Sequence, residues 1–80
     1  MDVQVLGPGC KNCNALETAT ADALERLGID QPITKITDYG QIASFGVMST
    51  PALAIDGEVK TTGRVPTVDE IARIISAAAT

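Results

Sequence analysis

The sequence predicts an α/β fold with the element order β-α-β-α-β-β-α. Three observations support this prediction. Short runs rich in β-branched residues alternate with helical patterns over the first half of the chain. The dipeptide Asp56-Gly57 separates two strand-like runs, which predicts a hairpin. Thr67 and Glu70 stand at capping-box spacing before a final apolar pattern, which predicts a closing helix.

The first half of the chain is expected to hold two strands and a long helix. Residues 3–6 are mostly apolar and predict a buried strand, which Gly7-Pro8-Gly9 ends. A helix is expected from residue 11 or 14 to residue 27, with Gly28 as its C′ residue. Its apolar stripe follows i, i+3, i+4 spacing and consists of Leu16, Ala19, Ala23, Leu24 and Leu27. Residues 32–37 predict a second strand, which should pair in parallel with the first through a right-handed crossover.

The second half is expected to hold a short helix, the hairpin and the last helix. Asp38 is a suitable N-cap for a helix that ends near Phe45, with Tyr39 and Phe45 in core or half-buried positions. Residues 52–55 and 58–62 predict the two hairpin strands. The last helix should run from Thr67 to about residue 78. Its expected buried side consists of Val68, Ile71, Ala72, Ile74 and Ile75.

Composition limits the class of protein. Eighty residues, of which 45% are hydrophobic, are enough for a single domain that spans 1–80, with a core of aliphatic side chains. The formal charge of −4 and the lack of a basic run argue against nucleic acid and anionic membranes as partners. No stretch approaches the roughly 18 apolar residues of a membrane span, and no signal-peptide pattern begins the chain. The expected protein is therefore cytoplasmic and monomeric.

The only two cysteines of the chain form the motif Cys10-Lys11-Asn12-Cys13, between an apolar strand and a helix. This context places the first sulfur at the positive end of a helix, where a thiolate is stabilised, and brings the two sulfurs within reach of each other. A purely structural disulfide would close so short a loop that it would restrict the unfolded chain little. In a reducing compartment, such a pair indicates catalysis or metal binding rather than a structural role.

Three sequence features together resemble the thioredoxin superfamily in its smallest, glutaredoxin-sized form. They are Gly9-Cys10-Lys11-Asn12-Cys13, then Ser49-Thr50-Pro51 before the third strand, and Gly63-Arg64-Val65-Pro66-Thr67 before the last helix. The likeness is to the small "redox-active disulfide" thioredoxins of prokaryotes. It implies a minimal thioredoxin fold, with a central four-stranded mixed sheet flanked by three helices. It also implies a protein-disulfide reductase that needs no cofactor and acts on disulfide-containing target proteins.

The resemblance has limits that bear on the electron donor. The chain lacks the Trp and the Pro of Trp-Cys-Gly-Pro-Cys, and it lacks the Cys-Pro-Tyr-Cys motif of many glutaredoxins. The glutathione-binding pattern of two glycines followed further along by an Asp is not clearly present after the hairpin. These departures favour a thioredoxin-reductase-type donor over glutathione.

The resemblance also implies roles for individual residues. Cys10 is the nucleophile and Cys13 the resolving thiol, and together they form the redox-active disulfide. Pro51 is a cis-proline that lets the backbone of Thr50 pair with an extended substrate, although a trans proline that merely begins a strand is the alternative. Gly63 either contributes to the rim of the site or only shapes the entry to the last helix.

Gly9, Lys11 and Asn12 are candidates for tuning the cysteines; the alternative for Lys11 and Asn12 is that they are solvated loop residues. The chain has no histidine, so no imidazole can act as a base. Met48 is expected either in an apolar rim beside Pro51 or in ordinary packing, and Arg64 is expected in solvent rather than on an acidic partner.

A soluble Cu(I) carrier is the competing hypothesis, since two thiolates suit Cu(I). Small copper chaperones also begin with strand, CxxC loop and helix, but they resemble a β-α-β-β-α-β order that ends in a strand. Their loop carries Gly-Met-x-Cys, whereas Pro8 takes the place of the Met here. With only two cysteines and no histidine, a closed tetrahedral zinc site within one chain is not expected either, and no metal site is predicted. A third hypothesis, an adaptor that uses this fold only as a protein-interaction module, is hard to reconcile with an intact cysteine pair.

Overall fold

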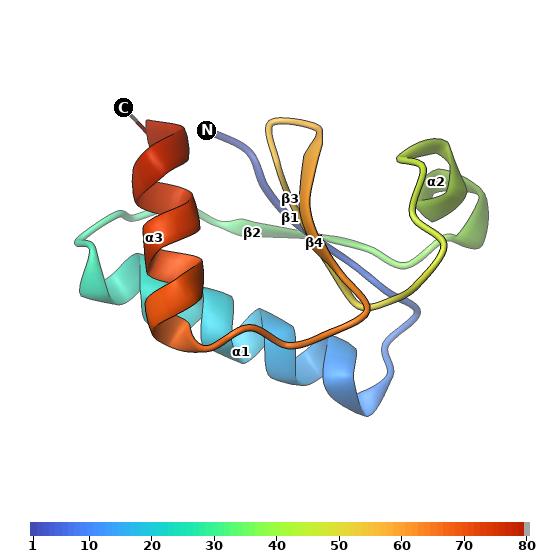
Figure 1. The fold of residues 1–80 in the computed structure, drawn as a ribbon, viewed down its shortest axis with the longest axis horizontal. Helices are drawn as coiled ribbons and strands as arrows, with labels where there is room; N and C mark the ends of the chain where they lie inside the picture. The colour runs from blue at the N-terminus through green and yellow to red at the C-terminus, as the bar shows by residue number, and fades with distance from the viewer. Residues whose placement is uncertain (80) are drawn as a thin grey trace.

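The computed structural model describes residues 1–79 and contains one four-stranded sheet in the order β2-β1-β3-β4 (Figure 1). Seven elements follow the predicted order. They are β1 (Val3–Leu6), α1 (Lys11–Arg26), β2 (Ile33–Ile36), α2 (Tyr39–Ser44), β3 (Ala52–Ile55), β4 (Glu58–Thr62) and α3 (Val68–Ala79).

The sheet is mixed, with one parallel and two antiparallel pairs of strands. β1 and β2, which are joined through α1, pair in parallel, with Val3 opposite Ile33. β1 and β3 pair in antiparallel fashion, as do β3 and β4 across the Asp56-Gly57 turn. Asp56 and Gly57 have φ angles of 53° and 82°, the left-handed conformation that a two-residue hairpin turn requires. All residues of the central strands β1 and β3 are buried.

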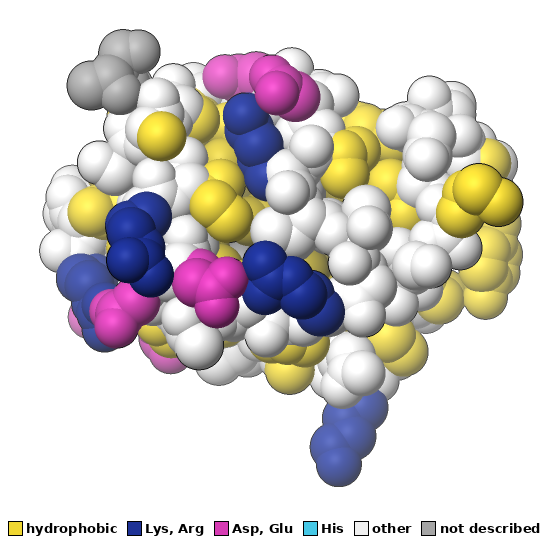
Figure 2. All heavy atoms as spheres, viewed as in Figure 1, with side chains coloured by type: hydrophobic (Ala, Val, Ile, Leu, Met, Phe, Trp, Pro, Cys, Tyr) yellow, Lys and Arg dark blue, Asp and Glu magenta, His cyan; other side chains and the backbone are white. Residues whose placement is uncertain are grey.

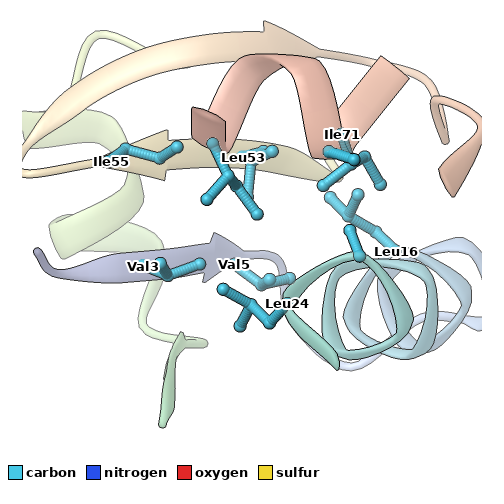
Figure 3. Packing of buried hydrophobic residues seen from close by; sticks show 10 residues of the cluster. Val3, Val5, Leu16, Leu24, Leu53, Ile55 and Ile71 are labelled. Atoms are coloured by element: carbon cyan, nitrogen blue, oxygen red, sulfur yellow. The ribbon is translucent and has the colours of Figure 1, made fainter. Parts of the chain in front are cut away.

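α1 and α3 cover one face of the sheet, and α2 stands against the other (Figure 1). Successive side chains of a strand point to opposite faces, so alternate residues of β1 and β3 enter the larger core under α1 and α3. Figure 3 shows these side chains meeting those of the two helices. The fully or nearly buried members of this core are Val3, Val5, Leu16, Ala23, Leu24, Leu53, Ile55, Ile71, Ala72 and Ile75.

The smaller core lies between the sheet and α2. Leu6, Ala52 and Ala54 point from the strands toward Ile42 of α2 and the nearby Val47. Asp38 is the N-cap of α2, where its carboxylate accepts a hydrogen bond from the Gln41 N–H at 2.9 Å. This cap and one buried isoleucine fix a helix of only six residues over the end of the sheet.

Two expectations about side chains are wrong. Tyr39, expected in the core or half buried, is 73% exposed because the inward face of α2 is that of Ile42. Leu27, expected on the buried stripe of α1, is 37% exposed because it is the C-cap residue, where the helix passes beyond α3 and the sheet. Conversely, Thr20 is fully buried on α1, and its hydroxyl donates to the Leu16 carbonyl at 2.7 Å.

Candidate functional site

The predicted site residues come from three loops that meet at one end of the sheet (Figure 1). Leu6, Ala52 and Thr62 are neighbours in the strand register, so the segments just beyond them share this end. Two backbone hydrogen bonds extend the sheet into the loops. The Gly7 N–H donates to the Ile36 carbonyl at 2.9 Å, and the Gly63 N–H donates to the Pro51 carbonyl at 2.8 Å.

Cys10 and Cys13 are joined in a disulfide at the start of α1, with their Cα atoms 5.0 Å apart. Cys10 is the N-cap residue of the helix, and its sulfur accepts a hydrogen bond from the Cys13 N–H at 3.2 Å. The helix therefore supplies a donor to this sulfur in the way that it usually does to a capping oxygen. Cys10 is exposed, whereas Cys13 is only 4% exposed.

The Ser49-Thr50-Pro51 loop lies beside Gly63. The Thr50–Pro51 peptide bond is cis, Pro51 is buried, and Thr50 is exposed. Gly63 adopts a φ of 73°, and a Cβ atom there would lie only 3.2 Å from the Ser49 Cβ. Both roles considered for Gly63 agree with this position, since it borders the Pro51 loop and also leads to α3.

Gly7 is a site residue that the sequence reasoning missed, having treated it only as part of a turn. It is buried, and a Cβ atom at this position would overlap the Cys13 sulfur and lie 3.0 Å from the Cys13 Cβ. The same Cβ would lie 3.9 Å from the Pro51 Cα. Nothing in the local sequence separates Gly7 from an ordinary turn glycine, because the contact with Cys13 depends on how the start of α1 folds back on the end of β1, and the contact with Pro51 on the pairing of β1 with β3.

The remaining candidates lie on the surface around the cysteines. Gly9, Lys11 and Asn12 are exposed, and Gly9 has a φ of 95° with open space around it. Met48 is 99% exposed, which rules out an ordinary packing role in this chain.

Arg64 is not free in solvent as expected, since its guanidinium lies 3.1 Å from the Glu70 carboxylate. That hydrogen bond is the main reason why the pKa of Glu70 is held below its usual value of 4.5. Glu70 also sits in the predicted capping box, where its N–H donates to the Thr67 hydroxyl at 3.2 Å. Its carboxylate pairs with Arg64 and, at 3.5 Å, with the same hydroxyl.

A groove of about 610 Å³ lies away from the cysteines, at the other end of α1. It is bordered by the last turns of α1, the connection that follows and the start of β2, and it contains none of the predicted site residues. Within residues 1–79, no group of three or more Cys, His, Asp or Glu side chains is arranged to hold a metal ion. Over the same residues, no helix is long and apolar enough to cross a membrane.

The fold and the cysteine pair together define a thiol–disulfide oxidoreductase. An α/β sheet carries two cysteines at the start of its first helix, one exposed and one buried, at disulfide distance and next to the Pro51 loop. This arrangement allows the exposed sulfur to form a mixed disulfide with another protein, which the buried sulfur can then resolve.

Comparison with known proteins places the chain in a family. The family model described as "Thioredoxin domain" matches residues 1–76. A thioredoxin from Methanothermobacter thermautotrophicus is 43% identical over 76 residues, which cover 95% of this chain and 99% of that protein. A thioredoxin from Methanocaldococcus jannaschii is 39% identical over 69 residues, which cover 86% of this chain and 79% of that protein. The chain belongs to the thioredoxin family, has a minimal thioredoxin fold, and is a protein-disulfide oxidoreductase.

Proposed function

We propose that Cys10 is the attacking thiol and Cys13 the resolving thiol in the reduction of disulfides in target proteins. The observation that carries this assignment is the difference in exposure, since Cys10 is open to solvent and Cys13 is 4% exposed. A protein disulfide can reach only an exposed sulfur. The helix start supports the same assignment, because the Cys13 N–H points at the Cys10 sulfur and would stabilise a thiolate there.

The reaction transfers two electrons and proceeds through one mixed disulfide. The Cys10 thiolate attacks one sulfur of the target, the target S–S bond breaks, and the departing thiolate takes up a proton. The Cys13 thiol then loses its proton and attacks the Cys10 sulfur. The mixed disulfide breaks, the second target thiol is released, and the chain keeps the Cys10–Cys13 disulfide. A second dithiol protein must then reduce this disulfide for another cycle.

Thr50 and Pro51 are proposed to hold the target segment. The antiparallel register of β3 begins at Ala52, so Thr50 lies before the paired strand and is exposed. An extended segment can use such backbone groups by strand addition. Gly63 would border this segment, since it lies against Ser49, and Gly9, Lys11 and Asn12 would adjust the reactivity of Cys10 from the other side.

The cysteine pair needs an electron donor and a compartment in which it can be kept reduced. The electron donor is proposed to be a protein of the thioredoxin-reductase type, because the glutathione pattern is not clearly present after the hairpin. Residues 1–80 are proposed to form one domain that acts as a monomer, and a cytoplasmic setting agrees with a cysteine pair that must be kept reduced between cycles. Reduction by a purified reductase and by glutathione, followed in parallel, distinguishes the two donors.

Two serine variants test the assignment of roles. A model protein disulfide is mixed with reduced Cys10→Ser or Cys13→Ser protein, quenched by alkylation, and analysed by mass spectrometry. We expect Cys13→Ser to accumulate a mixed disulfide through Cys10, and Cys10→Ser to form none and to lose activity. Activity that survives in Cys10→Ser, with no adduct on Cys13→Ser, would show that the roles are assigned wrongly. The same assay on wild-type protein with metal removed by a chelator and on Cu(I)-loaded protein distinguishes disulfide reduction from Cu(I) carriage, since disulfide reduction should proceed without metal.

A further inference from the structure

The charges of the chain are unevenly distributed around the cysteine pair. The protein has ten acidic and six basic residues, for a formal charge of −4. Yet the segments that form the site, residues 7–13, 47–51 and 63–66, contain two basic residues and no Asp or Glu. These three segments therefore carry no side-chain carboxylate, although the protein as a whole is acidic. On the face seen in Figure 2 the acidic side chains gather over the α1–α3 side and the β3–β4 turn, and Asp38, the N-cap of α2, is an exposed acidic residue outside these two groups.

One of the two basic residues is not neutralised. Arg64 is paired with Glu70, and the other ion pairs within residues 1–79 join Arg26 to Asp69, Lys35 to Glu17 and Lys60 to Glu58. Lys11 is in none of these pairs, is exposed, and directly follows Cys10. The first turn of α1 has no acidic residue, so the positive potential of the helix start is not offset either.

An exposed apolar side chain stands in the loop that leads to Pro51. The side chain of Met48 is 99% exposed and stands three residues before Pro51. A flexible thioether can adapt to many apolar side chains, which suits a reductase with several targets. Met48 thus supplies adaptable contact area, while Lys11 supplies the charge.

We propose that this oxidoreductase prefers target disulfides that have an Asp or Glu side chain beside the attacked cysteine. The inference rests on the proposed function, and it names the target class of the same site. Opposite charges attract during the encounter and orient the target, whereas a basic target would be repelled by Lys11 and the helix start. Exposed pairs contribute modestly, so we expect an effect of about two- to fivefold in the second-order rate constant of reduction.

Three peptide disulfides of identical sequence test the proposal, with Glu, Gln or Lys next to the attacked cysteine. Each is mixed with the reduced protein by stopped flow, at low and at high salt. Each rate is divided by the rate of the same peptide with dithiothreitol, which also attacks as a thiolate but carries no other charge, so that differences in the reactivity of the peptides toward a thiolate are removed. The variants are Lys11→Gln, Lys11→Glu and the control Lys60→Gln, which removes a lysine paired with Glu58 on β4.

The expected order for the wild type and for Lys60→Gln is Glu above Gln above Lys, with the differences reduced by salt. Lys11→Gln should lower the Glu-to-Lys ratio at least twofold, and Lys11→Glu should reverse the order. The ratio is the deciding quantity, since a change in the reactivity of Cys10 alone would slow all three peptides equally. Equal normalised rates for the three peptides, or a ratio unaffected by Lys11→Glu, would overturn the inference while leaving the oxidoreductase function intact. Failure to reduce even the Gln peptide would instead contradict the proposed function.

Discussion

The contact between Gly7 and the Cys13 sulfur makes Gly7→Ala the sharpest test of how the fold sets the redox chemistry. The φ of Gly7 is not positive, so an alanine meets no backbone strain there. Its methyl group, however, would overlap the Cys13 sulfur and press on the Cys13 Cβ at 3.0 Å. Gly7 is buried, so the methyl group cannot turn toward solvent.

The magnitude follows from overpacking, which typically costs about 1–3 kcal/mol. In the disulfide form, the Cys13 sulfur is tied to Cys10 and cannot move away from the new methyl group. In the dithiol form it is free to rotate, so most of the cost falls on the oxidised state. A cost of 1–3 kcal/mol on that state corresponds to a rise of about 20–65 mV in the two-electron midpoint potential.

The assay is a titration in thiol–disulfide buffers of defined potential, with the oxidised and reduced fractions counted by alkylation and mass spectrometry. Thermal unfolding of both redox forms accompanies it, and Gly7→Ala should lower the melting temperature of the oxidised form more than that of the reduced form. Gly40→Ala is the matched control. Its Cβ would lie 3.1 Å from the Asp38 carboxylate oxygen that caps α2 and would contact neither cysteine, so any loss of stability should be equal in the two redox forms. A Gly7→Ala potential equal to that of Gly40→Ala, with equal loss of stability in both forms, would refute the reasoning.

Two further predictions concern the core and the start of α3. Ile71→Ala removes a fully buried side chain from the larger core (Figure 3) and should lower the free energy of unfolding by about 2–5 kcal/mol in a urea titration; a loss below about 1 kcal/mol would mean that the core closes over the cavity. Arg64 lowers the pKa of Glu70 in the folded protein, so the ionised carboxylate stabilises the fold at every pH above the usual pKa of 4.5. This stabilisation is lost as the pH falls below 4.5 and through the lowered pKa of the folded state. Glu70→Gln should therefore be less stable than the wild type at pH 7, with the difference shrinking below pH 4.5; a difference that does not depend on pH would contradict this account.

Most of the secondary structure could be predicted because its signals are local. The Asp38 cap, the Asp56-Gly57 turn and the Thr67 cap act within a few residues of themselves, and each lies where it was expected. The side chains of α2 were harder to place. Six residues give less than two turns, too few for periodicity to show which side faces the sheet, so Tyr39 was wrongly placed in the core or half buried.

In the candidate site too, features with a local sequence signal were predicted and features that depend on packing were not. The cysteine pair was found at once because both sulfurs belong to one short segment next to a helix start. The contact of Gly7 with Cys13 was not found, and neither was the ion pair of Arg64 with Glu70. Each depends on how separate elements pack, and residue types alone do not reveal such contacts.

The sequence by itself determined the order of the elements, the position of the redox pair and the excess of negative charge, because these depend on residue type and spacing along the chain. Only the tertiary structure decided that Gly7 lies against the Cys13 sulfur and that Lys11 is left without an acidic partner within residues 1–79. The physical reason is that β1, β3 and β4 pair in a fixed register, which gathers three distant loops at one end of the sheet. Burial and charge at that end are properties of the assembled loops rather than of any one of them.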